Sequence, residues 1–201
     1  YMGEHGWFDK RFMYEESLRT PLLIAYSGHI QPGTVCNKLV QNIDYAPTFL
    51  DLAGVSKPKE LPGRSLTPLF KAGDKVKGWR SSIYYHYYDY PTYHMVRKHD
   101  GVRTDRYKLI HFYGEGGLDA VKENKYQRQP GTREHGCMTY LTSLGYFEPK
   151  DSAVNYNELY DLQADPHELN NLYGKPGYEK ITKQLQKQLN DYRKSIGVDE
   201  Y

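Results

Sequence analysis

Hydrophobic residues occur in short blocks separated by polar and glycine-rich stretches. The run from Pro21 to Tyr26 is apolar at consecutive positions, which predicts a strand buried on both faces. Asp44 precedes a mostly apolar segment that ends at Gly54, and this pattern predicts a helix capped by the aspartate and closed by the glycine. A short helical turn is predicted over Ser65 to Phe70.

Three later segments predict strands of a small antiparallel sheet; the first two are rich in tyrosine, and the third is shorter. These segments are residues 82–88, 107–113 and 157–162. After Pro176, apolar residues recur at helical spacing and define one face of a predicted helix. They are Tyr178, Ile181, Leu185, Leu189 and Tyr192. We expect that face to pack on the sheet.

Two stretches divide the chain. The loop around residues 71–80, rich in Gly, Lys and Asp, is the predicted subdomain boundary. Residues 114–156 form a polar connection too long for an ordinary loop, and we interpret it as a functional loop or an insertion. Residues 1–7 contain no basic segment followed by an apolar one, so they are not a signal peptide. We expect the natural protein to extend upstream.

Composition excludes several classes of protein. The chain has 201 residues, with 27 Lys and Arg against 25 Asp and Glu, so its formal charge of +2 gives no electrostatic case for a nucleic-acid partner. No apolar run approaches the roughly 20 residues that span a membrane. Cys36 and Cys137 lie in no metal-binding or redox spacing, and whether they pair stays open. The 21 tyrosines fit an aromatic-rich sheet or a wet binding surface equally well.

The chain contains no nucleophile elbow, P-loop, dinucleotide fingerprint or zincin motif. What it contains is an ordered set of blocks: Gly3 to Lys10, Tyr14 to Leu22, Asp44 to Gly54, Gly63 to Leu66, Gly101 to Ile110, Glu158 to Leu162 and Asp165 to Asn171. In this order the first four blocks resemble the stretch that follows the Asp-Asn-Gly or Asp-His-Gly metal motif of type I sulfatases, in the alkaline-phosphatase-like superfamily. The last three resemble the C-terminal subdomain of the same enzymes.

The resemblance implies an α/β fold class, with this chain as the α+β C-terminal part of an alkaline-phosphatase-like sulfatase fold. Residues 1–75 would end the catalytic α/β domain. Residues 76–201 would form the antiparallel-sheet subdomain packed by a C-terminal helix, with the insertion at about 114–156. The sequence from Gly6 to Ser17 is similar to that of sulfatases acting on 6-O-sulfated N-acetylglucosamine in glycosaminoglycans and mucin glycans. Such enzymes are periplasmic or secreted, or lysosomal in eukaryotes.

Important parts of that enzyme do not map onto this sequence. The family's formylglycine nucleophile arises in a Cys/Ser-x-Pro/Ala-x-Arg motif, and neither Cys36 nor Cys137 lies in one. The aspartates and the Asp-Asn pair that hold calcium are also missing, so no metal ligand is assigned here. We therefore expect nucleophile and Ca²⁺ to belong to a missing N-terminal catalytic region, which would be this chain's partner. The isolated chain is predicted to be inactive.

One catalytic side chain does map, and it is Lys10. The resemblance implies that its ammonium donates to a sulfate oxygen and to the bridging oxygen as charge develops. Outside the block it would read as a solvated surface lysine. His5 is either a glycan contact or a satisfied loop histidine.

The tyrosine-rich segment from Tyr84 to His94 could dock a sugar ring, with His94 and His86 as the preferred substrate contacts. The alternative is an edge strand and turn packed on the terminal helix.

Two other functions stay open. A free-standing, non-catalytic carbohydrate-binding module would rely on the tyrosine-rich segment. A related phosphoesterase or phosphonate hydrolase would keep the fold but carry a threonine nucleophile upstream, where a sulfatase carries Cys or Ser.

Overall fold

The computed structural model describes residues 1–6, 10–87, 96–114 and 154–198. The chain divides into two compact units. The sheet unit comprises Tyr1–Thr20 and Tyr84–Tyr201, and the helical unit comprises Pro21–Ile83. The first twenty residues thus belong with the sheet, whereas we expected residues 1–75 to share one domain. The extent of a complete catalytic domain stays a prediction.

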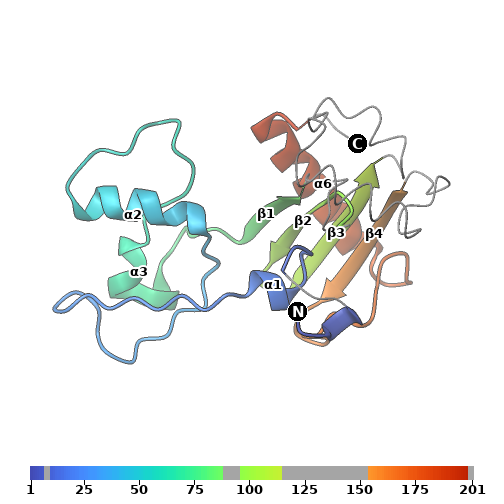
Figure 1. The fold of residues 1–201 in the computed structure, drawn as a ribbon, viewed down its shortest axis with the longest axis horizontal. Helices are drawn as coiled ribbons and strands as arrows, with labels where there is room; N and C mark the ends of the chain where they lie inside the picture. The colour runs from blue at the N-terminus through green and yellow to red at the C-terminus, as the bar shows by residue number, and fades with distance from the viewer. Residues whose placement is uncertain (7–9, 88–95, 115–153, 199–201) are drawn as a thin grey trace, which may run out of the picture. The chain divides into compact units, whose positions relative to one another are not determined.

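The sheet unit is built on four strands in the order β1-β2-β3-β4 (Figure 1). Their bounds are Ser82–Tyr87 for β1, His99–Thr104 for β2, Tyr107–Gly114 for β3 and Val154–Asp161 for β4. β3 pairs antiparallel with β2 and with β4, so that Leu109 lies opposite Val102 on one side and Leu159 on the other. The predicted antiparallel sheet is confirmed, although the sequence did not predict β2.

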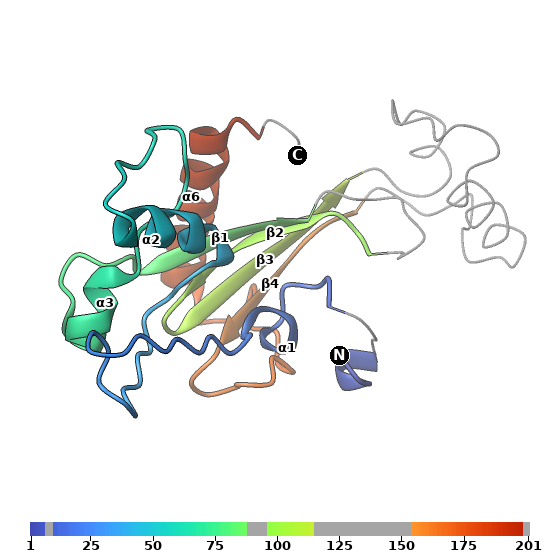
Figure 2. The ribbon, with the colours of Figure 1, turned by 60° about the vertical axis from the view of Figure 1, so that its left-hand side comes forward.

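One face of the sheet is covered by the C-terminal helix α6, Glu179–Ile196 (Figure 2). Val102, Leu109 and Leu159 point to this side, because alternate residues of a strand share a face, and they pack with Leu185 and Leu189 of the helix. The predicted packing of the helix on the sheet is confirmed. Gly197 then ends the helix in a left-handed conformation that glycine adopts without strain.

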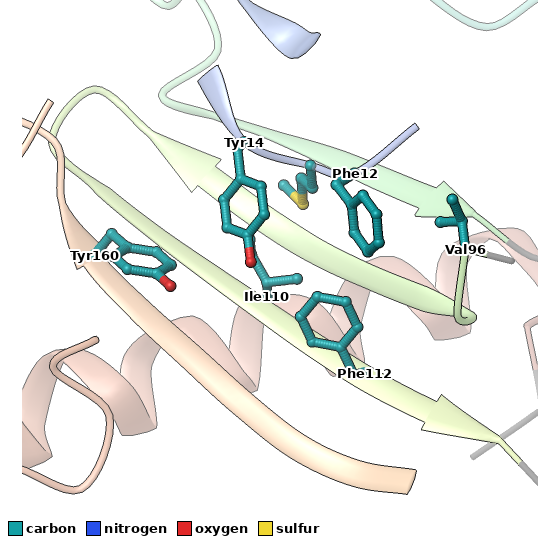
Figure 3. Close-up of a cluster of buried hydrophobic side chains, with 7 residues drawn as sticks. Phe12, Tyr14, Val96, Ile110, Phe112 and Tyr160 are labelled. Atoms are coloured by element: carbon teal, nitrogen blue, oxygen red, sulfur yellow. The ribbon is translucent and has the colours of Figure 1, made fainter. Parts of the chain in front are cut away.

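The opposite face is covered by the segment Phe12–Tyr14, which precedes the short helix α1, Glu15–Leu18. Figure 3 shows Phe12 and Tyr14 directed at residues of the sheet, with α6 behind the strands; the residues beneath them are Val96, Ile110, Phe112 and Tyr160. Met13 is fully buried, and a Cβ on Gly101 would lie 2.5 Å from its sulfur. Glycine at position 101 therefore lets this segment lie directly on β2.

The helical unit contains the 3₁₀ turns Asn42–Asp44 and Gly73–Lys75 and the helices α2, Tyr45–Leu52, and α3, Thr67–Ala72. Both predicted helices are confirmed, but the predicted cap is wrong. Asp44 makes no side-chain cap on α2. Its carboxylate is fully buried, accepts the backbone N–H groups of Gln41 and Arg64 at 2.8 Å, and pairs with the Arg80 guanidinium. Asp44 therefore caps the 3₁₀ turn before α2 through the Gln41 N–H and also binds a distant arginine.

The predicted buried strand from Pro21 to Tyr26 is also wrong for this structure. The segment has no strand conformation, and every one of its residues is exposed, Leu23 at 92%. A strand that is apolar on both faces needs neighbouring strands and a covering layer. The four-stranded sheet contains no part of residues 21–26. The intrinsic preference of the segment is therefore not satisfied within the described residues.

Candidate functional site

Lys10, the predicted catalytic residue, lies on the chain just before the segment Phe12–Tyr14. It is exposed, and its backbone carbonyl accepts a hydrogen bond of 2.6 Å from the Ser17 hydroxyl of α1. The next residues of the chain enter the core of the sheet unit. The loop that carries Lys10 is therefore fixed by the hydrogen bond to its backbone and by the burial of the residues that follow it.

His5 lies in the 3₁₀ turn Glu4–Gly6 with a positive φ of 55°. A positive φ is uncommon outside glycine, although histidine is among the residues enriched there. The His5 ring stacks on the Tyr14 ring at 4.2 Å, and its Nε2 lies 3.4 Å from Glu16 Oε2. A strained residue held by its surroundings is a common feature of functional sites. The structure thus brings His5 onto the same segment that follows Lys10.

Glu158 lies under this segment on β4, and sequence reasoning did not single it out as a site residue. Its carboxylate accepts hydrogen bonds from the hydroxyls of Tyr14 at 2.8 Å and Tyr160 at 3.0 Å. Burial raises the pKa of Glu158, and the two phenolic donors only partly offset that effect. A perturbed carboxylate beside a strained histidine identifies this end of the sheet as a candidate functional region.

A buried ion cluster fixes α1 to the sheet, and it consists of Glu15, Arg103, Lys108 and Glu168. Glu15 Oε2 lies 3.0 Å from Arg103 Nη2, and Glu15 Oε1 lies 2.9 Å from Lys108 Nζ. Lys108 Nζ is also 2.7 Å from Glu168 Oε1, and both of these side chains are fully buried. Burial by itself would raise the pKa of Glu15, but Arg103 and Lys108 lower it below its ordinary value.

Glu168 completes the cluster through strained backbone. Its φ is 53°, and its Oε2 accepts the backbone N–H of Glu15 at 2.6 Å. Burial raises the pKa of Glu168, although Lys108 acts against that effect. The sequence signal for this cluster was present, since its members lie in three of the quoted blocks. Nothing local in the blocks indicated that they meet.

His86, a predicted glycan contact, lies on the other side of the sheet. Its Nε2 is 2.5 Å from the Tyr113 hydroxyl, and its neighbour on that face, Tyr84, stacks on Tyr192 of α6. The adjacent Tyr85 points the opposite way and donates to the carbonyl of Arg11 at 2.9 Å. The structure therefore separates His86 from His5 and favours a packing role for His86. His94 lies outside the described residues.

Beside His86, a second buried polar network supports the α6 face. Arg193 of α6 donates from Nε to Asp100 Oδ2 at 2.5 Å and from Nη2 to Asp100 Oδ1 at 2.9 Å. His111 Nδ1 lies 3.0 Å from the same Arg193 nitrogen. Burial would raise the pKa of Asp100, but His111 and Arg193 lower it. The network explains how a strand as polar as β2 can be buried.

Calcium is implied by the sulfatase resemblance, but the described residues do not fit it. Within residues 1–6, 10–87, 96–114 and 154–198, no group of three or more His, Cys, Asp or Glu side chains could hold a metal ion. In the same ranges, no helix has the length and apolarity to cross a membrane. Cys36 is exposed, while Cys137 lies outside the description, so their pairing stays untested.

Comparison with known proteins defines the class. The solved structure of BT4656 in complex with its substrate D-glucosamine-2-N,6-O-disulfate superposes with a TM-score of 0.76 and 38% identity, over 99% of this chain and 33% of that one. This chain therefore shares its fold with about a third of that protein. A family model described as N-sulphoglucosamine sulphohydrolase, C-terminal, matches residues 3–130 and 146–195, and this chain belongs to that family.

Two curated relatives support the assignment. An N-acetylglucosamine-6-O-sulfatase of Bacteroides thetaiotaomicron is 39% identical over 96% of this chain and 28% of its own length. An N-acetylglucosamine-6-sulfatase of Bos taurus is 32% identical over 82% of this chain and 27% of its own length. The chain therefore spans less than a third of the length of these relatives.

Proposed function

We propose that this chain works as the C-terminal part of a sulfatase that hydrolyses sulfate esters of glycans, with 6-O-sulfated N-acetylglucosamine as the substrate unit. The observation that carries the proposal is the fit over 99% of the chain to a protein solved in complex with its substrate D-glucosamine-2-N,6-O-disulfate, a sugar that carries a 6-O-sulfate. The 39% identity to an N-acetylglucosamine-6-O-sulfatase supports the same sugar and position.

In this proposal Lys10 is the catalytic contribution of the chain. Its ammonium neutralises charge on the sulfate and donates to the oxygen that leaves with the sugar. His5 contacts the glycan from the same anchored segment. The formylglycine and Ca²⁺ of the preceding region would supply the nucleophile and further charge neutralisation, and no residue described here replaces either.

The helical unit supports the proposal by what it leaves exposed. Apolar side chains of residues 21–26 and of α2 face solvent, among them Leu23 at 92% and Phe49 at 69%. Patches of this kind mark surfaces that pack against other protein. We propose that the preceding catalytic region covers them and gives residues 21–26 the strand partners they lack. We also propose a periplasmic, secreted or lysosomal location for the whole protein, which is what the resemblance to sulfatases implies.

The test is Lys10→Ala in the intact sulfatase. Loss of one preorganised charge-stabilising donor lowers kcat by about two to three orders of magnitude, here on a 6-sulfated N-acetylglucosamine substrate. The thermal midpoint should stay unchanged, because Lys10 is exposed. Lys194→Ala is the matched control, since Lys194 is an exposed lysine at the end of α6. If Lys10→Ala stays within a few-fold of the parent enzyme, Lys10 is a surface charge.

A further inference from the structure

Burying the ion cluster costs free energy of folding, which suggests that the cluster has a role other than stability. Removing charges from water opposes folding, so a buried ion pair is seldom the most stabilising choice for a core. Glu168 adds backbone strain at φ 53°, which a non-glycine residue adopts unfavourably. A hydrophobic cluster would fill the same space with less penalty. Ion pairs, unlike apolar contacts, are directional, so the cluster fixes the groups that it joins in one defined geometry.

The geometry that the cluster defines is the position of α1. Glu168 Oε2 accepts the first N–H of the helix, and Glu15 at that same position is bound by Arg103 and Lys108. Both ends of the Glu15 residue, backbone and carboxylate, are therefore fixed to the sheet. A helix of only four residues has little stability of its own. Its orientation thus depends on these bonds.

The position of α1 is passed to Lys10 by one hydrogen bond. Ser17, two residues after Glu15 on α1, donates from its hydroxyl to the Lys10 carbonyl at 2.6 Å. The path from Glu168 through Glu15 and Ser17 to the Lys10 backbone contains only direct bonds. We propose that Glu168, Lys108, Glu15 and Ser17 are positioning residues that hold Lys10 for proton donation to the leaving oxygen, an inference that rests on the role of Lys10 proposed above.

Proton donation to the leaving oxygen has a kinetic signature that a structural role lacks. A phenol with a strongly electron-withdrawing substituent leaves as a stable anion and needs little help from an acid. An unsubstituted phenol needs more help. Loss of Lys10 positioning should therefore slow phenyl sulfate far more than 4-nitrophenyl sulfate, which has nearly the same size.

The experiment measures kcat for both aryl sulfates in the intact sulfatase carrying Ser17→Ala or Glu168→Gln. We expect each variant to lose about ten- to a hundredfold on phenyl sulfate, the scale of a small misplacement of a catalytic group, with a loss at least about fivefold smaller on 4-nitrophenyl sulfate, which needs charge neutralisation but little proton donation. In a Lys10→Ala background neither substitution should cause a further loss, because the group that they position is gone.

Two matched controls test the chemistry of each substitution away from this path. Ser195→Ala removes a serine hydroxyl that donates to the carbonyl of Tyr192 at 2.7 Å. Glu179→Gln changes an exposed carboxylate that accepts the N–H of Gly177 at the start of α6. Both controls should keep kcat for both substrates.

The outcomes separate this inference from the proposed function. Equal losses on the two substrates, with a lower thermal midpoint, would show a structural cluster and overturn the inference alone, provided that Lys10→Ala is selective for phenyl sulfate. If Lys10→Ala shows no such selectivity, the role of Lys10 is wrong and nothing remains to be positioned. Should Glu168→Gln fail to fold, Ser17→Ala decides by itself, since Ser17 lies outside the buried cluster.

Discussion

At the scale of single residues, His99 has the surroundings that most affect its protonation. His99 is fully buried among aromatic rings, with the Phe112 centroid at 5.2 Å and the Tyr87 centroid at 5.5 Å. Its Nδ1 donates to the carbonyl of Arg97 at 2.8 Å. Burial lowers the pKa of His99 to about 4 from an ordinary value near 6.5. The folded protein therefore holds this ring neutral at pH values where the unfolded chain charges it.

This difference predicts a loss of stability in acid. As the pH falls below the unfolded pKa, the unfolded state binds the proton first, so the free energy of unfolding declines until the folded pKa is reached. The contribution of His99 to that decline is about 3 kcal/mol. Urea unfolding at pH 7 and near pH 4.5 should show a smaller pH effect for His99→Phe than for the parent protein. The exposed His167→Gln should behave like the parent, and a parallel response in His99→Phe would contradict the prediction.

At the scale of elements, the local sequence pattern predicted the helices and strands whose formation depends on neighbouring residues. The apolar spacing after Pro176 identified α6, two tyrosine-rich segments identified β1 and β3, and the shorter segment at residues 157–162 identified β4. β2 could not be predicted, because its buried polar residues are satisfied from far away. Asp100, for example, pairs with Arg193, which lies 93 residues later in the chain. The pairing of Asp44 with Arg80, 36 residues away, could not be predicted for the same reason.

The candidate site follows the same rule. Lys10 and His5 could be identified from a resembling block, and Lys10 was already the one predicted catalytic residue. Glu158 and the ion cluster could not be, since Tyr14 meets Glu158 only once β4 has paired with β3 and the Phe12–Tyr14 segment lies over that face. Residues whose partners are distant in sequence produce no local spacing pattern from which their contacts could be predicted. Their presence in the blocks that resemble sulfatases indicated a family but not how these residues are placed in space.

β1 provides a test of which face of the sheet serves the substrate. Its alternation sends Tyr84 and His86 toward α6 and Tyr85 toward the Phe12–Tyr14 segment. If His86 reads the glycan, His86→Ala lowers kcat/KM on the 6-sulfated sugar but spares a small aryl sulfate. The hydrogen bond to Tyr113 favours the other result, a lower thermal midpoint with both substrates equally affected per folded molecule. We expect that second result, and a sugar-selective loss would restore His86 to the binding site.

At the scale of the whole molecule, the parts present predict a chain that cannot catalyse alone. It has the lysine of the proposed site, but its sequence has no Cys/Ser-x-Pro/Ala-x-Arg motif and spans 28% of its Bacteroides relative. Purified chain incubated with Ca²⁺ and 4-nitrophenyl sulfate should give the same rate as buffer. Calcium-dependent turnover above that of a Lys10→Ala sample would overturn the expectation that a missing region supplies the nucleophile and the metal ligands.

The Phe12–Tyr14 segment also has a consequence for how the chain reaches its native state. It is made before the strands that it covers, most of which follow only after the helical unit. Tyr14 and its partner Glu158 are separated by 144 positions. Contacts of such long range form late and slowly, because a large loop must close before they contribute. The loop of Lys10 should therefore be among the last parts of the sheet unit to become ordered, with the sheet's aromatic face open to chaperones until then.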